Sequence, residues 1–182
     1  CNVNVVGSLN VVEASIINDV PITIGVSTDK ACLSESVYGA SKYLMERVFM
    51  NVNNDDATRF ALTRFANVAH SAGSVLPFWL KLKSEGKPLK LTDPDMNRLI
   101  FTKEDLAKFI SDDIEIVGKR PGEKTDEDLI SEREISRTYI HGDDIHIRME
   151  ENKSEDNRLT EPYNSKSAPK MTSDEMGKLV WG

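Results

Sequence analysis

The sequence ITIGVSTDKACLSESVYGASKYLMERV, residues 22–48, sets the architecture of the chain. Residues 22–28 are short, apolar and β-branched, which is typical of a strand buried on both faces in a parallel sheet. From Ser36 to about Asn54 large side chains recur at steps of three or four, which predicts a helix. The stretch RFALTRF, residues 59–65, predicts a second strand. Strand, helix and strand joined by short links form a βαβ unit, so we predict an α/β protein with a doubly wound parallel, Rossmann-like sheet.

Further elements flank this unit. Apolar side chains at helical spacing predict a helix over residues 4–17, and beyond Asn67 the pattern changes to that of a smaller appended region. In that region we predict an apolar helix near VLPFWLKLK (75–83), short strands at LKLTD (89–93) and RLIFT (98–102), a short helix over 102–110 with Thr102 as N-cap, a strand at DIEIVG (113–118), a hairpin in TYIHGDDIHIRM (138–149) turning at Gly142 and Asp143, an irregular connection over 150–170, and a last helix from Thr172 to Val180.

Composition excludes several classes of protein. The chain has 182 residues, of which 39% are hydrophobic and 29% charged, as in soluble globular proteins. Its net charge of −7 argues against a nucleic-acid partner, because phosphate contacts need clustered cations. Only Cys1 and Cys32 occur, so neither a disulfide framework nor a paired CxxC metal site is available, which favours a reducing cytoplasm. Since no apolar run approaches the ~18 residues that span a bilayer, we expect a cytoplasmic protein without membrane insertion.

The first chemically suggestive stretch is Ser27-Thr28-Asp29-Lys30, at the carboxyl end of the first predicted strand. Open α/β sheets bind their ligands at this edge, so the position favours a functional role. The alternative interpretation is structural: Thr28 and Asp29 cap the next element, and Lys30 is solvated.

The second stretch is Tyr38-Gly-Ala-Ser-Lys42, in which Tyr38 and Lys42 are four residues apart and share one face of a helix. A nearby ammonium group makes a phenol a stronger acid, so that its phenolate becomes usable as a base near neutral pH. The alternative interpretation is an amphipathic surface pair, because Tyr and Lys meet at this spacing by chance. The order of a strand, STDK and then YGASK at the start of a helix favours the functional interpretation.

Ordered strings run through most of the chain: NVVGSLNVVEAS, STDKA, YGASK, TRFANV, GSVLPFW, LTDPDMNR and RPGEK. In this order they resemble the extended short-chain dehydrogenase/reductase family and, more narrowly, its UDP-N-acetylglucosamine 4,6-dehydratases of polysaccharide biosynthesis. The resemblance is strong from Asn2 to Ile130 and loose beyond. It implies that residues 1–68 are the C-terminal part of a nucleotide-binding Rossmann-like domain and that residues 69–182 form a UDP-sugar-binding region.

The resemblance assigns catalytic roles to residues after the first strand and in the following helix. It implies that Thr28 hydrogen-bonds the C4 oxygen of the sugar and that Tyr38 takes the C4 hydroxyl proton. Lys42 would hold the nicotinamide ribose and support Tyr38 as a base. Asp29 would protonate the departing C6 hydroxyl, and Lys30, kept neutral by burial, would remove the C5 proton.

Other positions are implied to contact the cofactor or the substrate. The cofactor is NADP or NAD, tightly bound and regenerated at each turnover, and its further contacts are Val26, Ser27 and Val68. The implied contacts to the UDP-sugar are Asn67, Ala72, Gly73, Ser74, Val75, Leu76, Pro77, Arg98 and Arg120. Arg120 would contact the pyrophosphate, for which a guanidinium fork is suited. The alternatives are that Asn67 is a turn residue, that the arginines are surface charges and that VLPFW belongs to the core.

The chain also departs from the family. No glycine pair has the spacing of the Gly-x-Gly-x-x-Gly fingerprint, so we expect the strands that carry this motif to lie before Cys1. Residues 70–73 stand where the family usually has an Arg, and after Ile110 relatives insert another strand and helix. His141 and His146 lack the spacing of a zinc site, so we interpret them as structural and expect no metal.

We therefore expect a nucleotide-sugar 4,6-dehydratase, an NAD(P)-dependent lyase that converts UDP-N-acetylglucosamine to a UDP-4-keto-6-deoxy sugar and acts as a homo-oligomer. The presence of Tyr38 favours the type that inverts C5, an added isomerase activity, because membrane-bound retaining relatives often lack this tyrosine. The alternatives are a UDP-hexose 4-epimerase or nucleotide-sugar reductase, which need no acid and base beside Thr28, and a noncatalytic scaffold that has lost the cofactor motif.

Overall fold

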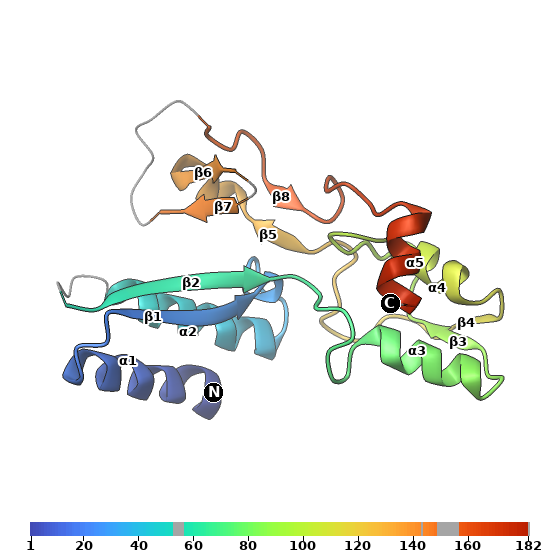
Figure 1. Cartoon of the computed structure of the whole chain (residues 1–182), viewed down its shortest axis with the longest axis horizontal. Helices are drawn as coiled ribbons and strands as arrows, with labels where there is room; N and C mark the ends of the chain where they lie inside the picture. Colours follow the sequence, from blue (N-terminus) through green and yellow to red (C-terminus); the bar gives the residue numbers. More distant parts are fainter. Residues whose placement is uncertain (53–56, 143, 149–156, 182) are drawn as a thin grey trace. The chain divides into compact units, whose positions relative to one another are not determined.

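The computed structural model describes residues 1–52, 57–142, 144–148 and 157–181. The chain forms two compact units, Cys1–Phe65 with Asp128–Tyr163, and Ala66–Glu127 with Asn164–Gly182. Figure 1 labels the elements of both units. The sequence predicts a domain boundary after Val68, close to Ala66, where the chain passes from the first unit to the second. The chain then returns to the first unit at Asp128. The nucleotide-binding and sugar-binding roles of the two regions stay predictions.

The first unit is built on a parallel pair of strands. β1 (Ile22–Thr28) and β2 (Arg59–Phe65) pair along their whole length, so their carboxyl ends lie at the same edge. α2 (Val37–Asn51) connects them, which confirms the βαβ unit predicted from the sequence. A π-helical turn, η1 (Asn2–Val6), leads into α1 (Gly7–Ile17), where the sequence predicts one continuous helix.

The two faces of this sheet have different surroundings. On one face, α1 and α2 cover the strands (Figure 1), and an apolar cluster joins the layers: Val12, Met45, Phe49 and Phe60. The opposite face of β1 carries Ile22, Ile24 and Val26, all of which are more than half exposed. Because side chains alternate along a strand, Ser27 faces the helices and lies on the covered side.

Short elements of the later segment complete the first unit. β5 (Asp128–Ile130) precedes the 3-10 helix η3 (Glu132–Arg137), and β6 (Thr138–His141) pairs with β7 (Asp144–Ile147) in the predicted antiparallel hairpin. β8 (Tyr163–Asn164) pairs with β5. The predicted turn residue Asp143 and residues 149–156, in and before the predicted irregular connection, lie outside the described residues.

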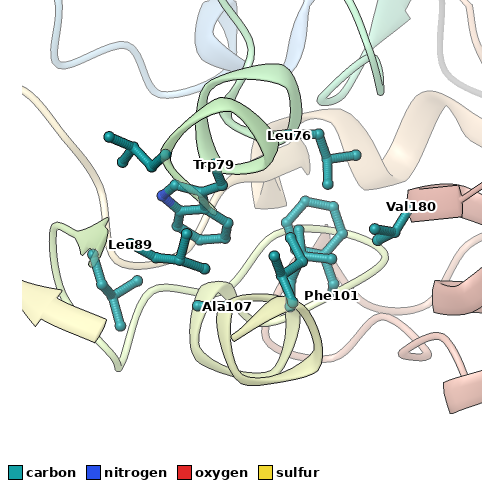
Figure 2. Close-up of a cluster of buried hydrophobic side chains, with 10 residues drawn as sticks. Leu76, Trp79, Leu89, Phe101, Ala107 and Val180 are labelled. Carbon is teal, nitrogen blue, oxygen red and sulfur yellow. The ribbon is translucent and has the colours of Figure 1, made fainter. Parts of the chain in front are cut away.

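The second unit has its own parallel pair and core. β3 (Leu89–Leu91) and β4 (Ile114–Ile116) pair in parallel, with α4 (Lys103–Ile110) between them in the chain. α3 (Val75–Ser84) and α5 (Ser173–Trp181) contribute to the same core. Figure 2 shows this core, whose buried members are Leu76, Trp79, Leu82, Leu89, Leu91, Phe101, Leu106, Ala107, Ile110 and Val180. The VLPFW stripe therefore supplies core residues, as the structural interpretation of it expects.

The strand predicted at RLIFT, residues 98–102, is wrong. The Arg98 N–H donates to the Phe101 carbonyl oxygen at 2.8 Å, so the backbone turns back on itself here. An isolated antiparallel bridge between Asn97 and Thr102 flanks the turn. The apolar run of residues 99–101 is typical of a strand, but Leu99 and Phe101 are buried from within a turn. Thr102 then caps α4 as predicted.

The length and hydrophobicity of a helix determine whether it can cross a membrane. A helix needs about 20 apolar residues to cross a bilayer. Among the residues that the structure describes, no helix is both long enough and apolar enough to do so.

Candidate functional site

A buried carboxylate lies where β1 ends. Thr28, the last residue of β1, leads into η2 (Asp29–Ala31), a single 3-10 turn. Asp29 is 0% exposed. Its Oδ1 accepts hydrogen bonds from the Thr28 hydroxyl at 2.7 Å, from the Lys30 N–H at 2.9 Å and from Lys30 Nζ at 3.0 Å. The structure thus joins Thr28, Asp29 and Lys30 in one cluster at the carboxyl edge of the sheet.

The second oxygen of this carboxylate has different surroundings. Asp29 Oδ2 is buried and has no hydrogen-bond partner among the described residues. A buried polar atom without a partner is costly and rare, and such atoms mark positions that a ligand or water satisfies. Asp29 therefore has one oxygen committed to its neighbours and one available to a ligand hydroxyl.

A glycine brings α2 against this cluster. The Ser36 hydroxyl caps the helix by accepting from the Gly39 N–H at 3.0 Å. A Cβ on Gly39 would lie 2.1 Å from the Lys30 carbonyl oxygen, so a side chain at this position collides with the backbone of η2. The first turn of α2, which carries Tyr38, therefore lies directly against the turn that carries Asp29 and Lys30.

Tyr38 and Lys42 occupy consecutive turns of α2. Tyr38 is 51% exposed. Lys42 Nζ donates to the Val26 carbonyl oxygen at 2.8 Å. The Lys42 amine therefore reaches the same end of β1 as the Asp29 cluster. A phenol and an ammonium group one turn apart are both hydrogen-bond donors, which fits the neighbouring hydroxyl groups of a ribose. This pair of donors suits the ribose of a nucleotide.

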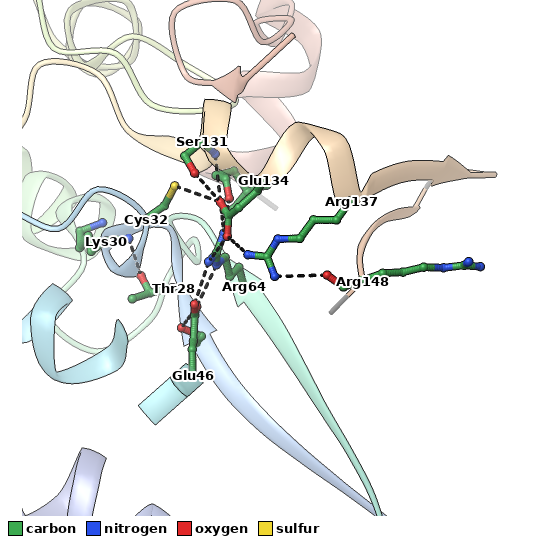
Figure 3. A network of polar contacts seen from close by, with 11 residues as sticks. Thr28, Lys30, Cys32, Glu46, Arg64, Ser131, Glu134, Arg137 and Arg148 are labelled. Carbon is green, nitrogen blue, oxygen red and sulfur yellow. Dashed lines mark hydrogen bonds and ion pairs between the residues drawn. The ribbon is translucent and has the colours of Figure 1, made fainter. Parts of the chain in front are cut away.

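A buried charge network that the sequence did not predict lies on the helix-covered face of the sheet (Figure 3). Arg64 NH2 lies 2.7 Å from Glu46 Oε2 and 2.8 Å from Glu134 Oε1. Burial acts to lower the pKa of Arg64, but its hydrogen bonds to both carboxylates raise it above the ordinary value. The available sequence signal was Glu46, four residues after Lys42 on the same helical face.

The first group of predicted substrate residues lies in the second unit, around the start of α3. Gly73 has a φ of +78°, and Ser74 follows as the N-cap of α3. The Ser74 hydroxyl is buried, and within the described ranges it has no hydrogen-bond partner. Leu76 lies in the core. Of the other predicted residues, Asn67, Val68, Ala72 and Pro77 are exposed, and Val75 is partly buried.

The predicted arginines of the second unit have different environments. Arg98 is buried, with NH1 donating to the Thr125 carbonyl oxygen at 3.4 Å and NH2 lying 3.9 Å from Glu127. Arg120 is exposed. Burial lowers the pKa of Lys103, and the positive charges of Arg98 and Arg120 act in the same direction. The sequence analysis did not single out Lys103. The available signal was its place in the first turn of α4, because the helix dipole favours anions there and a cation is unusual.

Comparisons with known proteins identify a family and relatives that this chain resembles. The family model described as "Polysaccharide biosynthesis protein" matches residues 1–112. The UDP-N-acetylglucosamine 4,6-dehydratase (inverting) of Campylobacter jejuni is 36% identical over 171 residues, covering 75% of this chain and 51% of the relative. The UDP-glucose 4-epimerase of Rickettsia canadensis is 30% identical over 187 residues, covering 82% and 55%. The chain spans about half the length of these curated relatives.

Solved structures share the fold. Pen from Bacillus thuringiensis has a TM-score of 0.87 at 22% identity, covering 98% of this chain and 67% of that one. The dTDP-glucose 4,6-dehydratase of Bacillus anthracis, crystallised with NAD, has a TM-score of 0.58 at 16% identity, covering 65% and 56%. These similarities confirm the α/β, Rossmann-like class predicted from the sequence.

Proposed function

The chain belongs to the polysaccharide biosynthesis protein family, among the extended short-chain dehydrogenases/reductases, and from this membership we propose that it carries the catalytic residues of a UDP-N-acetylglucosamine 4,6-dehydratase. The sequence identity to a relative of that name supports the substrate. The coarser assignment, a nucleotide-sugar dehydratase or epimerase type with a nicotinamide cofactor, follows from the relatives and the fold together.

One observation carries the choice of dehydration: an acid and an amine stand together beside Thr28. Asp29 is buried with Oδ2 unpartnered in the described part of the chain, and Lys30 Nζ lies 3.0 Å from Oδ1. Removal of water across C5 and C6 needs a base for the C5 proton and an acid for the C6 hydroxyl. A 4-epimerase or a reductase has no use for this pair.

The other residues act on C4. Tyr38 takes the proton of the C4 hydroxyl, and the Lys42 ammonium stabilises the resulting negative charge. The Thr28 hydroxyl donates to Asp29 Oδ1 in this structure, and with the sugar bound it would instead donate to the C4 oxygen, whose only proton goes to Tyr38. A bound NAD or NADP supplies reversible removal of hydrogen from C4, which acidifies the C5 proton.

The Asp29–Lys30 ion pair holds one transferable proton. In the charged pair the proton is on Lys30, and its transfer to Asp29 gives a neutral carboxylic acid beside a neutral amine. Only that second state lets Asp29 protonate the departing C6 hydroxyl while Lys30 removes the C5 proton.

The remaining assignments are part of the same proposal. Val26, Ser27 and Val68 contact the cofactor, and residues 67, 72–75 and 77 contact the sugar nucleotide, whereas Leu76 belongs to the core. Arg120 binds the pyrophosphate, and Arg98 contacts the UDP-sugar. Inversion at C5, cytoplasmic location and assembly into a homo-oligomer stay predictions from the sequence.

The product of the full-length protein tests this function. With UDP-N-acetylglucosamine in D2O, NMR should detect a 4-keto-6-deoxy sugar of inverted C5 configuration, with deuterium at C5 and the original C4 hydrogen at C6. An unchanged C5 configuration would assign the retaining outcome, and a 4-epimer with an intact C6 hydroxyl would assign the epimerase that relatives favour as the alternative. Lys30→Met should keep nucleotide binding but lose C5 proton removal, because the base acts in the transition state.

A further inference from the structure

The helix that carries Tyr38 and Lys42 presents a third polar residue on the same face. Glu46 follows Lys42 by four residues, so Tyr38, Lys42 and Glu46 form one row along α2. Glu46 is buried, and its Oε1 accepts a hydrogen bond from the Ser27 hydroxyl at 2.6 Å. Ser27 immediately precedes Thr28. The row therefore ends in a direct bond between the helix and the carboxyl end of β1.

The same carboxylate is gripped by the neighbouring strand. Arg64 of β2 donates from Nε to Glu46 Oε1 at 2.8 Å and from NH2 to Glu46 Oε2 at 2.7 Å. Two parallel bonds from a planar guanidinium fix orientation as well as distance. Glu46 is thus bonded to the ends of both parallel strands at once, which fixes where α2 stands along them.

Arg64 also binds two residues of the later segment of the first unit, Leu129 and Glu134. Its NH1 donates to the Leu129 carbonyl oxygen at 2.9 Å, and its NH2 donates to Glu134 Oε1 at 2.8 Å (Figure 3). Glu134 Oε2 accepts from the Ser131 hydroxyl at 2.8 Å and from the Cys32 thiol at 3.7 Å. Cys32 directly follows η2, so this one guanidinium links α2, both strands and the turn of Asp29.

Stability alone is a weak reason for such a network. Burying a charge pair costs desolvation, and apolar residues of the same volume often give equal or greater stability. Apolar contacts, however, are not directional, whereas these hydrogen bonds fix angles and register. A displacement of about 1 Å between reacting groups can slow catalysis by about 100-fold.

We propose that Glu46, acting through Ser27 and Arg64, is a positioning residue that sets Tyr38 and Lys42 against Thr28 and Asp29. The proposal rests on the proposed function, because it assigns the network to the geometry of that site. It concerns the step common to dehydratases and epimerases, the oxidation of C4, so it does not depend on which of the two products forms.

The test compares the full-length protein with its Glu46→Gln variant, in which an amide NH2 replaces one of the two oxygens that accept from the guanidinium. We expect kcat for turnover of UDP-N-acetylglucosamine to fall about 100-fold, with KM changed less than about threefold. Backbone hydrogen exchange of Lys30 and Cys32 should become faster. An unchanged kcat per folded molecule, or a KM that rises in proportion to the loss, would overturn the proposal.

A second variant and a control separate this role from folding. Arg64→Lys keeps the charge but lacks the fork, so it should lose kcat as well, and wild-type kcat in this variant contradicts the directional role. Glu13→Gln, an exposed carboxylate on α1, should leave kcat and exchange unchanged. If the wild-type protein turns over no UDP-sugar, the proposed function fails; unchanged exchange at Lys30 and Cys32 in Glu46→Gln then refutes the positioning role separately.

Discussion

Cys32 and Asp29 lie within one turn of each other, yet their polar atoms have opposite roles. Asp29 keeps an oxygen free for a ligand in the described structure, whereas the Cys32 thiol is buried against the Glu134 carboxylate. Burial, with the negative charge of Glu134 added, raises the pKa of Cys32 to about 12. A thiol reacts as its thiolate, so Cys32 is chemically silent at neutral pH.

Selective alkylation tests this environment. With iodoacetamide at about pH 8, the exposed Cys1 should be modified and Cys32 should not, as measured by peptide mass spectrometry, because reactivity follows the thiolate fraction. Denaturation in urea should make the two thiols equally reactive. Equal rates in the native protein would mean that the Cys32 site is open.

Glu134 predicts how the first unit responds to acid. Burial acts to raise the pKa of Glu134, but hydrogen bonds from Arg64 and Ser131 lower it below its ordinary value of 4.5. The unfolded chain then binds a proton at higher pH than the folded one, so the stabilisation is complete above pH 4.5 and is lost as pH falls through the folded value.

Urea unfolding at neutral and acidic pH measures this contribution. Glu134→Gln should reduce the free energy of unfolding at neutral pH by about 3–5 kcal/mol, since it breaks a buried pair. The variant should also lose less of its remaining stability on acidification than the wild type. The same loss in both proteins would assign the acid response to other carboxylates.

At this scale the sequence predicted what local order determines. Thr28, Asp29 and Lys30 come together because they end a recognisable strand, although that strand is buried on one face and not on both as predicted. Tyr38 and Lys42 share a face because helical spacing is fixed, and the roles of all five residues stay predictions. The partnership of Glu46, Arg64 and Glu134 joins residues far apart in the chain. Only tertiary packing brings these three residues together, so no local pattern in the sequence predicts the complete network.

Among the elements, β1, α2 and β2 formed as predicted because each has a clear periodicity and short links. RLIFT failed for an identifiable reason: a short apolar run is typical of a strand, but here Leu99 and Phe101 are buried from within a tight turn. Periodicity reports which side chains are buried. It does not report whether the backbone between them is extended.

Gly39 is an element-scale test, because it sets the contact between α2 and η2. Gly39→Ala places a Cβ 2.1 Å from the Lys30 carbonyl oxygen, which is backbone and cannot rotate away. We expect a loss of about 1–3 kcal/mol in the free energy of unfolding, as for overpacked cores. A thermal or urea unfolding curve measures it.

Gly177 provides the matched control. It lies inside α5, where an added Cβ would meet the Phe109 ring at an ordinary 3.7 Å. Gly177→Ala should therefore stabilise the protein by about 0.5–1 kcal/mol through helix propensity. If both variants shift stability in the same direction, the collision at Gly39 is not real.

For the whole molecule, no local pattern in the chain indicates that Asp128–Tyr163 returns to the first unit. Composition changes little at Asp128, and the decisive contacts are the bonds from Arg64 to Leu129 and Glu134. Such contacts depend on the placement of β2, which is known only once the sheet has formed. A boundary drawn from linear order therefore misses a segment that crosses back.

The open face of β1 predicts how the whole chain behaves in solution. Ile22, Ile24 and Val26 are 60%, 57% and 55% exposed, and they form one continuous apolar row because side chains alternate. Contiguous apolar surface on a sheet promotes association between molecules. We expect the 182-residue chain to self-associate with increasing concentration in sedimentation velocity.

Ile24→Thr distinguishes this face from other apolar surface. It keeps a β-branched side chain on an exposed strand position, so the free energy of unfolding should change by less than about 0.5 kcal/mol while association weakens. Ile17→Thr is the control, since Ile17 is 71% exposed on α1 and lies away from the strand row. Equal weakening by both substitutions would show that association has no preference for the sheet. A chain that stays monomeric at every concentration would contradict the prediction. The row of Ile22, Ile24 and Val26 would then be tolerated in water, and Ile24→Thr would have no intermolecular contact to remove.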